Sequence, residues 1–207
     1  MLIMGLLALG LFVTNRADAQ FSLGGNFSYL KFLGNEMKTS HPGIGIRGWY
    51  ATDDKFTLSY SANYFLASTE RFSSEYLDSF GNPVSYEMES KTSALQLDLR
   101  CNFYLLGDPV DDFNFYATIG FDMLFVNSAL EYPSEVPDKG AGEPESPNGF
   151  MVDLGIGAEK KLDFGYLFLE TGISFPPFRF SSSEGAYSET DIASFFQVNA
   201  GVRIPLD

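Results

Sequence analysis

Charged side chains recur two residues apart in this sequence, and that spacing suits them to ion pairing. Asp98 and Arg100 are the clearest case, in the segment 93–103, where the odd positions are almost all apolar. Residues two apart on a β-strand share one face. An arginine can hold a carboxylate through two parallel hydrogen bonds, and an unpaired buried charge is costly. The same alternation gives the complete candidate charge network: Arg47, Asp98, Arg100, Asp122, Asp153, Glu159, Glu170 and Arg203.

Few residues in the chain are suited to catalysis. His41 is the only histidine and stands beside Pro42 in a segment that we expect to be a loop. A Ser-His-Asp site at this rim would need partners from the loops, such as Ser40, Glu70 or Asp78, and serine and acid are common in any loop. The sequence has no metal-ligand spacing, CxxC pair or phosphate-binding glycine loop. We therefore predict no enzyme, no cofactor and no bound metal.

Strands must position the charged residues, because eight segments of about ten residues each show an alternation of period two. We expect these strands at 21–31, 43–50, 56–66, 93–103, 113–125, 149–160, 165–175 and 191–204. The turns at 52–55, 107–112 and 161–164 are short. The connections that alternate with them, including 68–90 and 127–148, are long and polar. This strict alternation is typical of an even-stranded barrel.

The two strand faces have the opposite polarity to those of a water-soluble sheet. One face is rich in Gly, Ser and Asn with paired charges, while the other is broad, aromatic and continuous. Such a barrel belongs in lipid with its polar face enclosed. We predict an all-β, eight-stranded antiparallel up-and-down transmembrane β-barrel with short periplasmic turns, long extracellular loops and both termini periplasmic. Since eight strands leave an interior just wide enough for side chains, we expect the charge network to be structural, with a gated pore as the alternative.

The N-terminus predicts export from the cytoplasm. Leu6 to Val13 form a short apolar run, and Ala17-Asp18-Ala19 has the small residues of a cleavage site, so we expect a signal peptide at 1–19 and a barrel domain at 20–207. No apolar run is long enough for a membrane-spanning helix. The formal net charge of −14 excludes nucleic acid as a partner.

Glycine and apolar residues are interspersed along the predicted strands, as in 43–48 and 199–203. In this composition and in its eight-strand architecture, the segment 21–206 resembles the small outer-membrane barrels. These are the OmpA-like and OmpX-like transmembrane domains and, more closely, the outer membrane protein beta-barrel domain proteins of Bacteroidota. The resemblance implies a bacterial outer-membrane location, contact with lipid and lipopolysaccharide, and an accessory role in a secretion, assembly or uptake machine.

Function in such a protein would lie in the loops. We therefore expect a non-enzymatic structural or interaction protein, either an accessory subunit of an envelope complex or a barrel that makes surface contacts. Two alternatives remain open: a small gated pore for ions or small solutes, and an outer-membrane enzyme with a rim site around His41.

Overall fold

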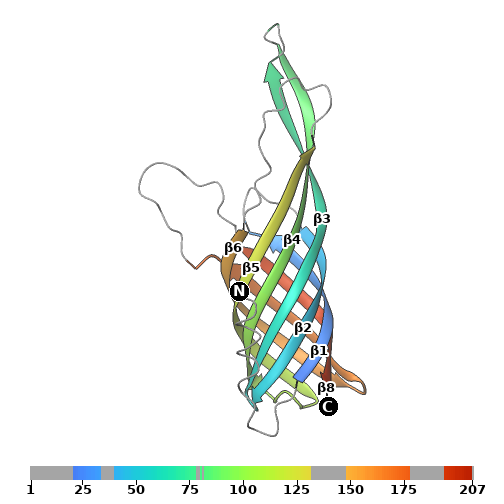
Figure 1. Cartoon of the computed structure of the whole chain (residues 1–207), viewed down its shortest axis with the longest axis vertical. Helices are drawn as coiled ribbons and strands as arrows, with labels where there is room; N and C mark the ends of the chain where they lie inside the picture. The colour runs from blue at the N-terminus through green and yellow to red at the C-terminus, as the bar shows by residue number, and fades with distance from the viewer. Residues whose placement is uncertain are drawn as a thin grey trace, which may run out of the picture.

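The structure is a computed structural model, which describes residues 21–33, 40–77, 80, 82–131, 148–177 and 194–206. They form one closed ring of antiparallel strands (Figure 1). The strands are β1 (Phe21–Phe32), β2 (Ser40–Asp53), β3 (Phe56–Leu77), β4 (Pro83–Leu106), β5 (Phe113–Glu131), β6 (Asn148–Leu162), β7 (Gly165–Phe175) and β8 (Phe195–Leu206). Each strand pairs with the next, and β1 closes the ring by pairing with β8. The predicted eight-stranded up-and-down barrel is confirmed.

The described part of the chain contains no helix that is long and apolar enough to cross a membrane.

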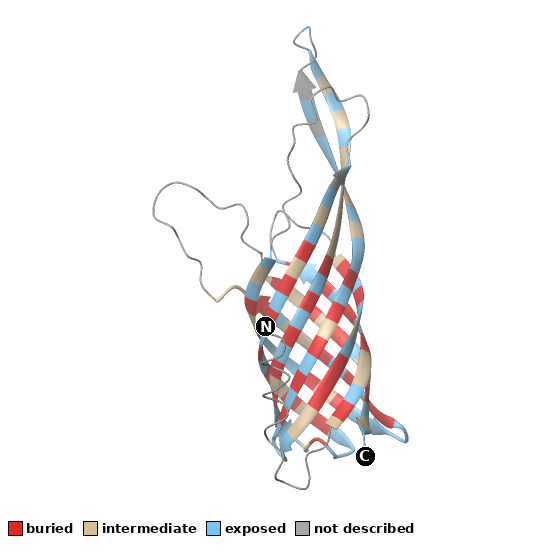
Figure 2. Cartoon of the chain, in the orientation of Figure 1, coloured by how far each residue is buried: buried red, intermediate tan, exposed pale blue. Residues whose placement is uncertain are grey.

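Buried and exposed side chains alternate along the strands of the barrel, which Figure 2 shows in red and blue. In β4, Leu97 and Leu99 are exposed, whereas Asp98 and Arg100 are buried. The outer face is apolar on every strand, with Phe27 of β1 among its most exposed members. A continuous apolar surface of this kind is unfavourable in water and suits the hydrocarbon of a bilayer. The expected orientation of the two faces therefore agrees with the structure.

Three short turns lie at one end of the barrel, which we call the turn end, and the opposite end is the loop end. In the β4–β5 turn, Gly107 has a φ of 72°, a conformation that favours glycine. Nζ of Lys55 donates a hydrogen bond of 2.9 Å to the carbonyl of Gly107, which ties the β2–β3 turn to the β4–β5 turn. Phe21 and Leu206 are paired, so β1 begins and β8 ends together at the turn end.

The largest departure from our prediction is the segment 68–90, which we expected to be a long polar loop. That prediction was wrong. β3 continues to Leu77 and β4 begins at Pro83, and the two strands pair from Ser68↔Thr92 to Leu77↔Pro83. Figure 1 shows this ribbon rising beyond the rest of the barrel. A ribbon that lies outside a membrane does not need apolar side chains that face lipid. Its amino-acid composition can therefore be as polar as that of a loop.

Other boundaries also moved. β5 extends to Glu131, where Glu89 of β4 is its partner, so residues 127–131 of the expected loop belong to a strand. β2 begins at Ser40, which places His41 in a strand rather than in a loop. The described part of β8 begins at Phe195. The signal peptide, most of the 127–148 loop and the expected start of the last strand at 191 lie outside the described residues.

Candidate functional site

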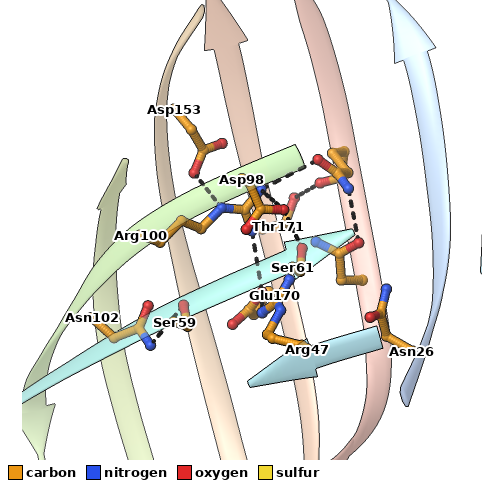
Figure 3. A network of polar contacts seen from close by, with 12 residues as sticks. Asn26, Arg47, Ser59, Ser61, Asp98, Arg100, Asn102, Asp153, Glu170 and Thr171 are labelled. Carbon is orange, nitrogen blue, oxygen red and sulfur yellow. Dashed lines mark hydrogen bonds and ion pairs between the residues drawn. The ribbon is translucent and has the colours of Figure 1, made fainter. Parts of the chain in front are cut away.

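The middle of the barrel interior holds a buried charge network around Arg100 of β4 (Figure 3). Its Nε lies 3.0 Å from Oδ1 of Asp153 on β6, and its Nη1 lies 3.4 Å from Oε2 of Glu170 on β7. Glu170 also forms an ion pair with Arg47 of β2 and accepts a hydrogen bond of 2.9 Å from the hydroxyl of Tyr116. One carboxylate thus joins strands β2, β4, β5 and β7 through side chains alone.

Two more carboxylates approach Arg100 on its other side. Nη2 of Arg100 lies 3.7 Å from Oδ2 of Asp98 and 3.9 Å from Oδ1 of Asp122. Each of these acids also accepts a hydroxyl hydrogen bond, Asp98 from Ser61 and Asp122 from Ser174 at 2.5 Å. The network therefore sets four carboxylates against the two guanidiniums of Arg47 and Arg100, with serine hydroxyls as additional donors.

Uncharged amides extend this network across the lumen. Gln96 of β4 and Gln197 of β8 exchange two hydrogen bonds of 3.0 Å each. Asn63 of β3 accepts a hydrogen bond of 2.9 Å from Asn26 of β1. β4 and β8 are not neighbours in the ring, so the glutamine pair spans the interior. In the sequence, these residues can be recognised as Asn or Gln at positions where the period-two alternation directs side chains into the barrel.

Glu159 and Arg203 form a separate ion pair at the turn end, away from the Arg100 network. Arg203 donates from Nε to Oε1 of Glu159 at 3.1 Å and from Nη2 to Oε2 at 2.7 Å, a two-pronged geometry. Its Nη2 also donates to the carbonyl of Pro109 at 2.7 Å, and its guanidinium lies 4.0 Å from the ring centroid of Tyr166. The eight predicted charges are thus all buried, but they divide into a group of six and a pair.

Aromatic side chains fill the interior between this pair and the Arg100 network. Trp49 of β2 meets Phe168 of β7 edge-on, with ring centroids 5.4 Å apart. The guanidinium carbon of Arg47 lies 5.6 Å from the Trp49 ring and 5.3 Å from the Phe168 ring. Such contacts between a cation and aromatic faces offset part of the cost of burying the charge.

The loop end of the interior is closed by a buried apolar layer that sequence reasoning missed. Its members are Leu30, Phe32, Phe65, Ala94, Leu124, Val126, Met151 and Phe195. The signal was present in segments such as Met123-Leu124-Phe125-Val126, where both faces of the strand are apolar and the alternation loses contrast. We had expected an interior that was polar throughout.

His41 belongs to this end of the interior, and our expectation of a loop-rim position for it was wrong. It is fully buried, with its ring edge-on to Phe32 and the ring centroids 5.8 Å apart. Because β2 begins one residue before it, the strand register directs it into the lumen. Within the described ranges, no group of His, Cys, Asp or Glu is arranged to hold a metal ion.

A second candidate site is the extension of β3 and β4, which we call the arm and define as residues 68–77 and 83–92. The end of β5, residues 128–131, pairs with its base. Alternation along the ribbon puts Phe72 and its partner Met88 on one face, and Arg71 and its partner Glu89 on the other. Arg71 and Glu89 form an exposed ion pair of 2.9 Å. The arm therefore carries Phe72 and Met88 together with Glu70 on one face, and the Arg71–Glu89 ion pair on the other.

Known proteins share this fold. A family model described as "Outer membrane protein beta-barrel domain" matches residues 4–203. The crystal structure of Neisserial surface protein A is 11% identical, with 89% of this chain and 96% of that chain covered and a TM-score of 0.53. The outer membrane protein OprG from Pseudomonas aeruginosa is 12% identical, with 91% and 96% covered and a TM-score of 0.50. No curated protein matches the sequence. At these identities the likeness to the solved structures concerns the fold alone.

Proposed function

We infer the function of this chain from one premise: it belongs to the outer membrane protein beta-barrel domain family. We propose that it is a closed barrel of the bacterial outer membrane whose role is to hold the arm in a fixed position for contact with a protein partner. The partner is either a component of a larger envelope complex or a protein met at the cell surface. Lipid and lipopolysaccharide would surround the apolar outer face.

The arm is the observation that carries this proposal. β3 and β4 continue through residues 68–77 and 83–92 beyond the point where β2 stops pairing with β3. At roughly 3.3 Å per residue, ten paired residues make a ribbon of about 30 Å. A barrel that only spanned a membrane would not need it. Contact functions are commonly placed on such projections from a rigid scaffold.

The filled interior favours a closed barrel over the gated pore. The apolar layer, the glutamine pair and the Arg100 network occupy successive levels between the loop end and the turn end. An eight-stranded barrel is only wide enough for its own side chains. An ion entering from the loop end would have to pass desolvated through the apolar layer before it reached any charged group.

We further propose that the turn end faces the periplasm and that the arm projects outside the cell. Short turns at one end and long connections at the other are typical of outer-membrane barrels with this orientation. Protease added to intact cells should then cut the arm and leave the barrel whole. Protection of the arm in intact cells, with cleavage only after the outer membrane is opened, would reverse this orientation.

The proposed role is tested by comparing the complete chain with an arm-less variant in which residues 69–91 are replaced by Asn-Gly, a favoured two-residue turn. We expect both chains to insert in the outer membrane, and only the complete chain to be crosslinked to a stoichiometric protein partner in cells. A partner retained by the arm-less barrel would contradict a role for the arm. Reproducible conductance of the purified complete chain in planar bilayers would favour the pore.

A further inference from the structure

Among the residues that the structure describes, strand β3 has an open edge along the arm. Its pairing with β2 ends at Gly43↔Phe65, and an irregularity in its pairing with β4 follows between Phe65 and Ser68. From Ser68 to Leu77, β4 is the only strand that pairs with β3 among the described residues. Backbone N–H and C=O groups on the other side of β3 are therefore available to pair with an added strand.

The other edge of the arm is a poorer template. β5 covers β4 as far as Glu89↔Glu131, so only residues 83–88 are open in the described structure. This stretch begins with Pro83, which has no backbone N–H to donate. The β3 edge is longer and contains no proline. Strand addition should therefore occur on β3 rather than on β4.

The charged face of the arm has an excess of acid. Its two cations are already engaged, Arg71 with Glu89 and Lys91 with Glu131, the latter at 2.6 Å. Glu75 and Glu87 are exposed and form no ion pair among the described residues. The register pairs Ser73 with Glu87 and Glu75 with Ser85, so the two acids are diagonal neighbours on this face.

The opposite face of the arm carries apolar side chains beside Glu70 and is only partly covered. Phe72 is 40% exposed, and its cross-strand partner is Met88. A two-stranded ribbon on its own is marginally stable in water, and a third strand would cover more of this face. An added strand would thus meet Glu75 on one face and Phe72 with Glu70 on the other.

We propose that the β3 edge of the arm binds an extended basic segment of a partner protein as an added strand, with basic side chains beside Glu75 and directed across β3 toward Glu87, and with an apolar side chain beside Phe72. The inference rests on the proposed function and names the chemical class of the partner. Backbone hydrogen bonds would supply the pairing, and the alternation of basic and apolar residues would supply the selectivity. About ten residues of partner would fill the edge.

A second copy of the chain fits this edge less well. Two barrels in one membrane have their β3 strands pointing the same way, so the two β3 edges can pair symmetrically only about a twofold axis along the strands. That axis exchanges the two faces of the ribbon, so the charged face of one arm would continue as the face of the other arm that carries Phe72 and Met88. A basic segment of a different protein has no such conflict.

The test uses the complete chain, isotope-labelled in detergent micelles, and two synthetic ten-residue peptides. One peptide alternates Lys with Val and the other alternates Glu with Val. We expect the Lys peptide to shift the backbone amide resonances of residues 68–77 and to leave those of residues 83–88 and of the barrel unchanged. The Glu peptide should not bind.

A charge-reversal variant, Glu75→Lys with Glu87→Lys, should weaken binding of the Lys peptide by about tenfold or more, since each exposed ion pair contributes up to roughly 1 kcal/mol. The matched control is Asp54→Lys, an exposed acid in the β2–β3 turn at the far end of the barrel, which should leave binding unchanged. Both variants should keep the barrel's heat-modifiable migration on gels, because both changes are on exposed positions.

Several results would overturn the inference: equal binding of the two peptides, amide shifts on the β4 edge, or no shift at about 1 mM peptide. Crosslinking of two arms to each other in the absence of peptide would identify a second copy as the occupant. If the arm captures a partner in cells through an acidic or uncharged segment, this inference fails and the proposed function stands. If the arm-less variant keeps its partner, the proposed function fails by itself.

Discussion

Arg100 is the side chain on which the balance of buried charge depends. It lies within 4 Å of four carboxylates, each from the lumen side of β4, β5, β6 or β7. A buried ion pair contributes little net stability when complete, but removing one partner leaves an uncompensated charge in a medium of low dielectric constant. The acids around Arg100 are therefore tolerated because this guanidinium is present.

We expect Arg100→Ala to lower the free energy of unfolding by about 3–5 kcal/mol, measured by urea unfolding in lipid vesicles. Adding Asp153→Asn should recover part of this loss, because Asp153 makes the shortest contact with Arg100, at 3.0 Å. The matched control is Arg71→Ala on the arm, whose ion pair is exposed and should contribute less than about 1 kcal/mol.

The double-mutant cycle also tests the geometry. If the effects of Arg100→Ala and Asp153→Asn add to within about 0.5 kcal/mol, the two side chains do not interact. If Arg100→Ala alone has no effect, the interior is hydrated and the surrounding acids are solvated without it.

Sequence alternation predicted that all eight charges face inward, but it could not predict their partners. Partners in the lumen come from strands that are not neighbours in sequence, and their levels depend on the stagger of the strands around the ring. Arg100 and Arg203 illustrate this limit, since the first joins a group of six and the second pairs with Glu159 alone. His41 was misplaced because a single strand boundary decided whether it lay in a loop or in the lumen.

At the scale of the strands, β4 serves two environments in succession. Residues 93–106 alternate between lipid and lumen, whereas residues 83–92 form the arm. The first part shows strong contrast between its faces and was readily predicted. We predicted a loop for the second part. Alternation of apolar and polar residues arises when one face of a strand is buried, and the arm has little structure to pack against.

Leu97→Arg tests the membrane part of this strand. Leu97 faces outward between Ala62 and Met123, near the middle of the barrel wall, so we expect a loss of about 2–4 kcal/mol in unfolding free energy, as for a charge at the bilayer midplane. Leu105→Arg, near the turn end of the same strand, should cost at most about 1 kcal/mol because it lies near the interface. Equal losses from the two substitutions would mean that the apolar band does not span the bilayer as assigned.

At the scale of the whole molecule, side chains of the described residues fill the barrel interior at more than one level. The apolar layer closes the loop end, and the Arg100 network fills the middle. Sequence composition predicted the narrow, side-chain-filled interior but not the apolar layer. The layer arises near the loop end, where both faces of a segment such as 123–126 are apolar, so the alternation cannot show which face is enclosed.

Phe65→Ala should lower the stability of the barrel without making it conduct ions. Phe65 is fully buried in the apolar layer, and its truncation should cost about 3–5 kcal/mol through lost burial and a residual cavity. We nevertheless expect no ion conductance in planar bilayers, because the Arg100 network remains beneath the cavity. Steady conductance from this variant would show that the apolar layer is the sole barrier.

Trp49 gives the barrel an internal optical reporter. It is the only tryptophan of the chain, it is 1% exposed, and its ring lies next to both Phe168 and the guanidinium of Arg47. Its emission should therefore be blue-shifted only when β2 and β7, which are not neighbours in the ring, have closed around it. Fluorescence of the unlabelled protein would then time the closing of the cylinder rather than the first contact of the chain with lipid.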